Sequence, residues 1–411
     1  MNERNKGKRD SSGIEGMNKA KLERKGREDI KIGKRFKSSD SNQREMNALL
    51  VLEDGTYFPG TGFGAEKRLE GEVVFNTGMV GYTEYLTDPS YKGQILALTY
   101  PLIGNYGVPG YKSDSLGLPV NFESHSIKVQ GLVVSEVCYN PSHWQCRKTL
   151  PEWFFKEKKT GIAGIDTRAL TKKLRACGSM RGILEVGHPD LETLQVEVKN
   201  VDDPNTRNLV SEVSLKKPVS YGEGRRKIVV IDCGVKANII RDICLRDSTV
   251  IQVPYNYPVN KILGYEPDGV VVSNGPGDPK MLMDSTVENV RELMSEKVPM
   301  FGICLGNQIM GLALGIDTYK LKFGHRSQNQ PCVDMDTKRC FITSQNHGFV
   351  LDEKTFPKDV LPWFVNANDR TIEGIRHKKK KIFAVQFHPE STPGPVDTSY
   401  LFDEFLGVCD D

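Results

Sequence analysis

A single cysteine, Cys304, stands between two glycines in the stretch MFGICLGNQIMGLALG, residues 300–315. An apolar run typical of a buried strand precedes it, and a helical pattern closed by Gly315 follows it. A Gly-x-Cys-x-Gly turn from strand into helix is the thiol counterpart of the nucleophile elbow, where the turn is so tight that the flanking residues must lack side chains. The helix N-terminus favours the reactive thiolate, and the backbone N–H of Leu305 would face the oxyanion formed when the thiolate attacks a carbonyl. The pattern therefore predicts a nucleophile, with a buried structural cysteine as the alternative.

A base and its orienting acid follow in KIFAVQFHPE, residues 381–390. Residues 382–387 have the pattern of a strand, so His388 and Glu390, two positions apart, can project to one face. His388 would take the proton of Cys304 and later give it to a leaving amine, while Glu390 would orient the imidazole and stabilise its charged form. A His-x-Glu pair is weak evidence alone, but together with the elbow it predicts a Cys–His–Glu triad.

The elements that must hold this triad alternate between strands and helices from residue 227 onwards. Alternating strands and helices with short connections indicate an α/β domain over 227–407, built on a doubly wound, mostly parallel sheet. Ligands of these sheets bind beyond the carboxyl ends of the strands, where both a Gly-Pro-Gly turn and Cys304 fall. Strands are predicted at 227–233, 249–256, the start of 268–279 and 298–303, and helices at 234–247, 283–297 and 305–315.

The residues before this region predict a different kind of domain. Residues 48–197 are interpreted as a mixed α+β domain, and the polar, turn-rich residues 198–226 as a linker. The pattern indicates strands within 48–64, 71–78, 93–101 and 128–137, and a helix over 166–177 with Asp166 or Thr167 as its cap.

The first 47 residues carry 14 Lys and Arg against 8 Asp and Glu, with almost no large apolar side chains. Such a segment cannot build a core, so we predict a disordered basic tail, with an organelle presequence or a partner- or nucleic-acid-binding arm as alternatives. The sequence has no secretory signal and no apolar run long enough to span a membrane.

The nine cysteines include no C-x-x-C pair, which favours free thiols in a reducing compartment. We therefore predict a cytoplasmic protein, or alternatively a mitochondrial or plastid one, that binds neither membrane nor nucleic acid.

Four motifs together carry a family resemblance: NGPGDP (274–279), FGICLGNQ (301–308), SQNHGF (344–349) and QFHPE (386–390). In this order and spacing they resemble the class I, or triad, glutamine amidotransferases, whose fold is flavodoxin-like. The rest of the chain narrows the resemblance to the small subunit, or glutaminase region, of carbamoyl-phosphate synthases, and extends it over about 48–407. The segments that carry this closer resemblance are 71–107, 164–175, 323–331 and 388–405.

The resemblance implies that glutamine is hydrolysed to glutamate through a Cys304 thioester. It also implies that the ammonia passes to a carbamoyl-phosphate synthase large subunit, separate or fused, which uses bicarbonate, ATP and magnesium. No cofactor or metal is then expected in this chain, which contains no G-x-x-x-x-G-K-[ST] loop. By motif match the glutamine contacts are Ser90, Gly275, Gly277, Leu305, Gln308, Asn346, Gly348 and Phe349.

One residue departs from the family pattern C-L-G-H-Q, because Asn307 occupies the position of the histidine. An ammonia-dependent relative that has lost its cysteine also has asparagine there. Since Cys304, His388, Glu390 and Gln308 are all present, we expect an active glutaminase. The alternatives are a glutaminase-inactive regulatory or docking subunit, or another class I amidotransferase. The resemblance does not distinguish arginine, urea and pyrimidine synthesis.

The remaining cysteines and histidines are assigned structural roles. Cys138, His143 and Cys146 offer zinc-type ligands, but a fourth ligand at short spacing is missing. His325 and His347 have no obvious carboxylate partner in the sequence, so they are expected to pack near the site.

Overall fold

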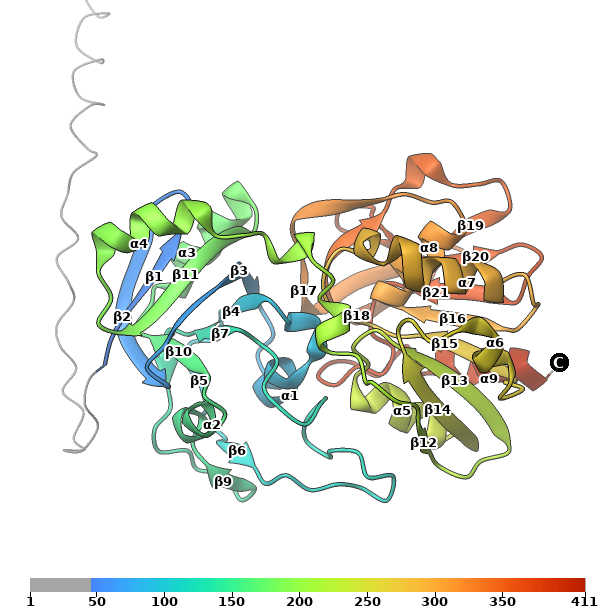
Figure 1. The fold of residues 1–411 in the computed structure, drawn as a ribbon, viewed down its shortest axis with the longest axis horizontal. Helices are drawn as coiled ribbons and strands as arrows, with labels where there is room; N and C mark the ends of the chain where they lie inside the picture. The colour runs from blue at the N-terminus through green and yellow to red at the C-terminus, as the bar shows by residue number, and fades with distance from the viewer. Residues whose placement is uncertain (1–45, 411) are drawn as a thin grey trace, which may run out of the picture. The chain divides into compact units, whose positions relative to one another are not determined.

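The structure is a computed structural model that describes residues 46–410 (Figure 1). The predicted tail over 1–47 therefore lies, up to residue 45, outside the described residues. No helix among residues 46–410 is both long and apolar enough to cross a membrane.

The first half of the described chain contains a closed barrel, which the sequence patterns did not predict. Around the barrel the strands follow the order β1, β11, β3, β4, β7, β10, β2. Apolar side chains that alternate along these strands fill its interior, where Leu50, Ile95 and Leu184 are fully buried. The bounds are Met46–Leu52 (β1), Tyr57–Gly64 (β2), Arg68–Asn76 (β3), Gln94–Leu98 (β4), Gly131–Val133 (β7), Thr160–Ala163 (β10) and Met180–Gly187 (β11).

Four helices pack their apolar faces on the barrel: α1 (Tyr82–Thr87), α2 (Leu150–Lys156), α3 (Thr167–Cys177) and α4 (Leu191–Glu197). The predicted helix over 166–177 is α3, whose N-cap Asp166 accepts a hydrogen bond from the Ala169 N–H at 2.8 Å. A 3₁₀ turn, Pro89–Tyr91, follows α1 and carries Ser90. Two small sheets complete this half, β5 (Leu102–Ile103) with β8 (Glu136–Val137) and β6 (Val108–Pro109) with β9 (Cys146–Lys148).

The segment interpreted as a linker is packed against the rest of the protein. It contains the 3₁₀ turns Val198–Asn200, Pro204–Thr206 and Val210–Glu212, and strand β12 (Val219–Tyr221), which pairs with β14. Val201 and Val210 are buried in two different apolar clusters. The polar composition of 198–226 reflects its turns, whereas its few apolar residues hold it in place.

A ten-stranded sheet forms the second half, in the order β12, β14, β13, β15, β16, β21, β20, β19, β17, β18. Adjacent strands from β14 to β21 are parallel, but all other adjacent pairs are antiparallel, so the prediction of a mostly parallel sheet holds only for the central part. The bounds are Arg226–Asp232 (β13), Ser248–Pro254 (β14), Gly269–Val272 (β15), Met300–Ile303 (β16), Thr318–Asp334 (β17), Cys340–Leu351 (β18), Val360–Asn366 (β19), Ile372–His377 (β20) and Ile382–Val385 (β21).

Helices cover both faces of the parallel part. One apolar cluster joins the strands to α6 (Val259–Leu263), α7 (Glu288–Leu293) and α8 (Leu305–Ala313), and another joins them to α5 (Ala237–Cys244) and α9 (Tyr400–Asp410). The helix predicted over 283–297 is shorter, because Asp284 has non-helical dihedral angles and α7 begins only at Glu288. Parallel strands end at the same edge of a sheet, and the segments that follow four of the five, β13, β15, β16 and β21, build the site.

Candidate active site

Cys304 lies in the turn between β16 and α8, with φ 55° and ψ −102°. A positive φ in a residue other than glycine is a strained conformation, and it is the one that the nucleophile elbow imposes. Both flanking glycines are required because neither position has room for a side chain. A Cβ on Gly306 would lie 2.0 Å from the Val272 carbonyl oxygen, and one on Gly302 would lie 2.6 Å from Met310 Sδ. The Gly-x-Cys-x-Gly pattern therefore has the steric cause that the sequence predicted.

His388 and Glu390 follow β21 and face each other, with His388 Nδ1 2.6 Å from Glu390 Oε1. The strand ends at Val385, earlier than predicted, so the two residues occupy the turn beyond it. The backbone N–H of His388 donates to the Ser344 carbonyl at 2.9 Å, which anchors this turn to β18. The second ring nitrogen, Nε2, is buried and has no hydrogen-bond partner within residues 46–410.

Neighbouring charges shift the pKa values of both His388 and Glu390 against the effect of burial. Burial alone would lower the pKa of His388, but the Glu390 carboxylate and the neighbouring Cys304 side chain raise it to about 10. Burial would likewise raise the pKa of Glu390, yet Lys236 and His388 hold it at about 2. The arrangement favours the imidazolium form of His388 next to Cys304.

Lys236, which the sequence analysis missed, is the main cation opposite Glu390. It lies between β13 and α5, is only 3% exposed, and its Nζ contacts Glu390 Oε1 at 2.9 Å and the Ser391 carbonyl at 3.1 Å. The pKa of Lys236 is raised despite its burial, because the carboxylates of Glu390, Glu123 and Asp88 surround it. The sequence around Lys236, GVKANII, gives no sign that this lysine lies at the site, because the carboxylate that it contacts, Glu390, lies 154 positions later.

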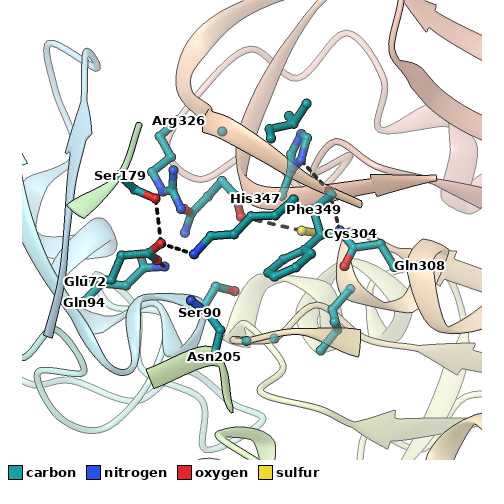
Figure 2. A pocket seen from close by; sticks show the side chains of 18 of the residues that line it. Glu72, Ser90, Gln94, Ser179, Asn205, Cys304, Gln308, Arg326, His347 and Phe349 are labelled. Atoms are coloured by element: carbon teal, nitrogen blue, oxygen red, sulfur yellow. Dashed lines mark hydrogen bonds and ion pairs between the residues drawn. The ribbon is translucent and has the colours of Figure 1, made fainter. Parts of the chain in front are cut away.

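A cavity opens on the sulfur of Cys304 (Figure 2). His388 neighbours Cys304, but neither His388 nor Glu390 is among the residues that line the cavity. All the glutamine contacts expected from the resemblance line this cavity: Ser90, Gly275, Gly277, Leu305, Gln308, Asn346, Gly348 and Phe349.

Hydrogen bonds hold the polar side chains on the wall of the cavity that contains Cys304. Gln308 Nε2 donates to the Phe349 carbonyl at 2.8 Å, and Asn346 Nδ2 donates to Asp88 Oδ2 at 3.0 Å. Ser90 Oγ accepts from Asn274 Nδ2 at 2.9 Å. Gly275 approaches the chain so closely that a Cβ there would lie 2.0 Å from the Cys233 carbonyl oxygen, so this position cannot carry a side chain.

The opposite wall of the cavity is charged and was not predicted. Figure 2 shows Glu72 and Ser179 across the cavity from Cys304. Glu72, from β3 of the barrel, pairs with Lys320 of β17 at 2.7 Å and accepts from Ser179 Oγ at 2.7 Å. Lys320 and Arg326 lower the pKa of the buried Glu72 carboxyl, although burial opposes them. Asn205, from the segment interpreted as a linker, also lines the cavity.

Asn307 points away from the cavity. It is fully buried in α8, and its Nδ2 donates to Gln386 Oε1 at 3.2 Å. The position where the sequence departs from the family pattern therefore contacts the protein interior instead of lining the cavity.

The expectation that His325 lacks a carboxylate partner is wrong. Its Nε2 lies 2.8 Å from Asp369 and its Nδ1 lies 3.3 Å from Glu373, and these carboxylates raise the pKa of His325 to about 9 although burial opposes them. His347 is buried beside it, with its ring nitrogens 3.0 Å from the Phe349 carbonyl and from Gln345 Oε1. His325, His347 and Glu373 form the one group among residues 46–410 whose ligand atoms are close enough to hold a metal ion. Both His347 nitrogens already have protein partners.

Both halves of the described chain match known protein families. Residues 50–184 match the family model for the carbamoyl-phosphate synthase small chain, CPSase domain, and residues 229–408 match that for class-I glutamine amidotransferase. A carbamoyl phosphate synthase small chain of Methanopyrus kandleri is 49% identical over 370 residues, which are 89% of this chain and 99% of the relative.

Two further relatives show the range of chains that contain a similar sequence. An arginine-specific small chain of Aspergillus oryzae is 45% identical, over 91% of this chain and 83% of the relative. The multifunctional protein CAD of Squalus acanthias is 48% identical over 89% of this chain, which spans only 16% of that protein. The chain therefore belongs to the carbamoyl-phosphate synthase small-chain family, and residues 229–408 are its class I glutamine amidotransferase domain.

Proposed function

We propose that Cys304, His388 and Glu390 hydrolyse glutamine to glutamate and ammonia. The observation that carries this proposal is the strained Cys304 at the floor of the cavity, with a buried imidazole and carboxylate directly behind it. A merely structural cysteine has no need of a positive φ or of a charged His–Glu pair.

In the first step the Cys304 thiolate attacks the side-chain amide carbon of glutamine. The carbonyl oxygen becomes an oxyanion, which the backbone N–H of Leu305 at the start of α8 stabilises. His388 Nε2 then gives its proton to the departing nitrogen, the C–N bond breaks, and ammonia leaves a thioester. In the second step His388 takes a proton from water and the resulting hydroxide attacks the thioester carbon. The C–S bond then breaks, which restores the Cys304 thiolate beside the His388 imidazolium, and the new carboxyl group of glutamate loses its proton to solvent.

We assign glutamine binding to the residues that line the cavity around Cys304, from Ser90 to Phe349. The glycines in this set support the assignment, because a backbone without side chains allows a small polar ligand to approach the glycine N–H groups. The charged groups Glu72, Lys320 and Arg326 on the opposite wall complement the zwitterionic end of an amino acid.

We further propose that the ammonia passes to a synthase subunit or a fused synthase region, which carries out the ATP- and magnesium-dependent steps of carbamoyl phosphate synthesis. The relatives, a carbamoyl phosphate synthase small chain and the multifunctional protein CAD, support this partner, and the absence of a G-x-x-x-x-G-K-[ST] loop from the sequence supports placing the ATP chemistry elsewhere. We place the protein in the cytoplasm, because all nine cysteines are free.

We also assign the parallel part of the sheet to the doubly wound class. Numbered along the chain, the order β14, β13, β15, β16, β21 is 2-1-3-4-5, which is the flavodoxin-like order. The cavity then lies beyond the carboxyl ends of the strands, where this class binds its ligands.

The test is Cys304→Ser in the complex with the synthase partner, assayed with glutamine and with ammonium chloride as nitrogen donors. The hydroxyl ionises far less readily than the thiol, so we expect glutamine-dependent carbamoyl phosphate synthesis to be lost and ammonia-dependent synthesis to be retained. Near-normal glutamine-dependent activity in Cys304→Ser would refute the mechanism. A wild-type chain that releases no ammonia from glutamine would instead favour a regulatory or docking subunit.

A further inference from the structure

Gln386 lies between the end of β21 and His388, and its side chain is fully buried. Its Nε2 donates to Cys304 Sγ at 3.7 Å. Its Oε1 accepts from two amides on α8, Asn307 Nδ2 and Gln308 Nε2, each at 3.2 Å. The steps described above give no role to this contact with the reacting sulfur.

The orientation of the Gln386 amide follows from its neighbours. Gln308 Nε2 also donates to the Phe349 carbonyl, a group that can only accept, so the nitrogen of Gln308 is identified by that bond. Its second hydrogen is then directed at Gln386, which must present its oxygen there. Since the Gln386 oxygen faces α8, its NH₂ group faces the sulfur of Cys304.

We propose that Gln386 stabilises the Cys304 thiolate through this N–H···S hydrogen bond, and that Asn307 is a positioning residue that holds the amide in its donating orientation. The proposal rests on the function proposed above. A thiolate accepts a hydrogen bond more strongly than a thiol, and in a buried site no water competes for the donor. The bond therefore acts with the His388 imidazolium to favour the reactive form of the cysteine.

The same geometry accounts for the departure at position 307. A histidine there would carry a ring N–H that can also donate towards Gln386 Oε1, so an asparagine preserves the donor while changing the side chain. Leucine, which is close to asparagine in size, would remove the donor and leave only Gln308 to orient the amide.

The experiment measures the pH dependence of Cys304 alkylation by iodoacetamide in the full chain, followed by mass spectrometry on the Cys304 peptide because the chain has nine cysteines. Gln386→Met keeps the length of the side chain and removes the donor. We expect the midpoint of its alkylation curve to lie about one pH unit above that of the wild type, the lower end of what a hydrogen bond to a charged group contributes. Gln386→Glu should shift the midpoint further, because a carboxylate oxygen would face the sulfur.

Gln252→Met is the matched control. Gln252 is also a buried amide in a hydrogen bond, with Tyr221, but it lies on β14, three strands away from β16 in the sheet. We expect its alkylation midpoint to equal that of the wild type. Asn307→His should likewise keep the midpoint, whereas Asn307→Leu should raise it in the same direction as Gln386→Met.

Activity gives a second measurement. Loss of the donor affects the nucleophile rather than the cavity walls, so Gln386→Met should lower kcat for glutamine hydrolysis with little change in KM. An unchanged alkylation midpoint in both Gln386→Met and Gln386→Glu would overturn the inference, and Gln386→Glu alone serves this purpose if the methionine variant does not fold. Such a result leaves the proposed function intact, because that function fails if Cys304→Ser still uses glutamine or if the wild-type chain releases no ammonia from glutamine.

Discussion

Lys236 offers the sharpest test of the electrostatics behind the nucleophile. Its Nζ is buried against Glu390 Oε1 at 2.9 Å, and Glu390 in turn contacts His388. Lys236→Met removes the charge and keeps a flexible chain of similar length in the same space. The change leaves the Glu390 carboxylate buried with His388 as its only remaining cation in contact.

Removing one partner of a buried ion pair costs about 3–5 kcal/mol of unfolding free energy, since the other charge stays uncompensated. We expect the lower end, about 3 kcal/mol, because the His388 imidazolium still neutralises part of the charge. With a urea dependence of about 3 kcal/mol per molar, the unfolding midpoint should fall by about 1 M. Glutaminase activity should fall at least about tenfold, because Glu390 is no longer held in place to orient the imidazole.

The pH dependence of the unfolding free energy tests the same ion pair between Lys236 and Glu390. The pKa of Glu390 is held at about 2 in the folded protein, against about 4.3 for an unperturbed glutamate, so the carboxylate adds stability above pH 4.3. That stability is lost as the pH falls from about 4.3 towards 2. Without Lys236 the folded pKa rises while the unfolded pKa stays the same, so the loss in Lys236→Met should be smaller and should be complete at higher pH than in the wild type.

Lys159→Met is the control, because Lys159 is half-buried and donates to the Val129 carbonyl, and it forms no ion pair with a carboxylate among residues 46–410. We expect it to change the urea midpoint little. A double variant, Lys236→Met with Glu390→Gln, should lose less stability than the two single changes added together. Strict additivity, or a loss below about 1 kcal/mol in Lys236→Met, would show that the ion pair does not set the charge state of the site.

Further predictions concern the elbow, the base and the tail. Gly306→Ala should abolish glutaminase activity and lower the midpoint of thermal unfolding, because its Cβ would lie 2.0 Å from the Val272 carbonyl oxygen. By contrast, Gly407→Ala in α9, where a Cβ meets nothing within 4 Å, should leave the stability unchanged or raise it. The folded pKa of His388, about 10, exceeds its ordinary value of about 6.5, so its contribution to stability is complete below pH 6.5 and is lost as the pH rises through 10. Urea titrations between pH 6 and 10.5 should show this loss in the wild type and a smaller one in Glu390→Gln. Removal of residues 1–45, which are outside the described part of the chain, should leave the glutaminase rate within about twofold, and a large loss would show that the tail contributes to the site.

Several parts of the site follow from the sequence because they depend on short-range geometry. The elbow is one, since the turn from β16 into α8 brings Gly302 against Gly306 and Met310 within a single strand–turn–helix unit. The His388–Glu390 pair is another, although it sits in a turn and not in the predicted strand. The periodicity of apolar residues likewise predicted β13 to β16 and the helices α5, α7 and α8, but not α6, because a buried strand and an amphipathic helix have different periods.

Other features depend on segments that only the folded chain brings together. Closure of the barrel requires β1 to pair with both β2 and β11, and no local pattern encodes which strand becomes the second neighbour. The antiparallel half of the ten-stranded sheet, from β20 to β18, was missed for the same reason.

The contacts that tune the nucleophile are of this second kind. Lys236 meets Glu390 across 154 positions, and Gln386 meets Cys304 across 82. Their residue types are ordinary for their elements, so the sequence gives no sign that they lie at the site. The identity of the reacting groups is thus local information, whereas their charge states depend on burial and on neighbours supplied by strand order, because desolvation and Coulomb interaction act through space and not along the chain.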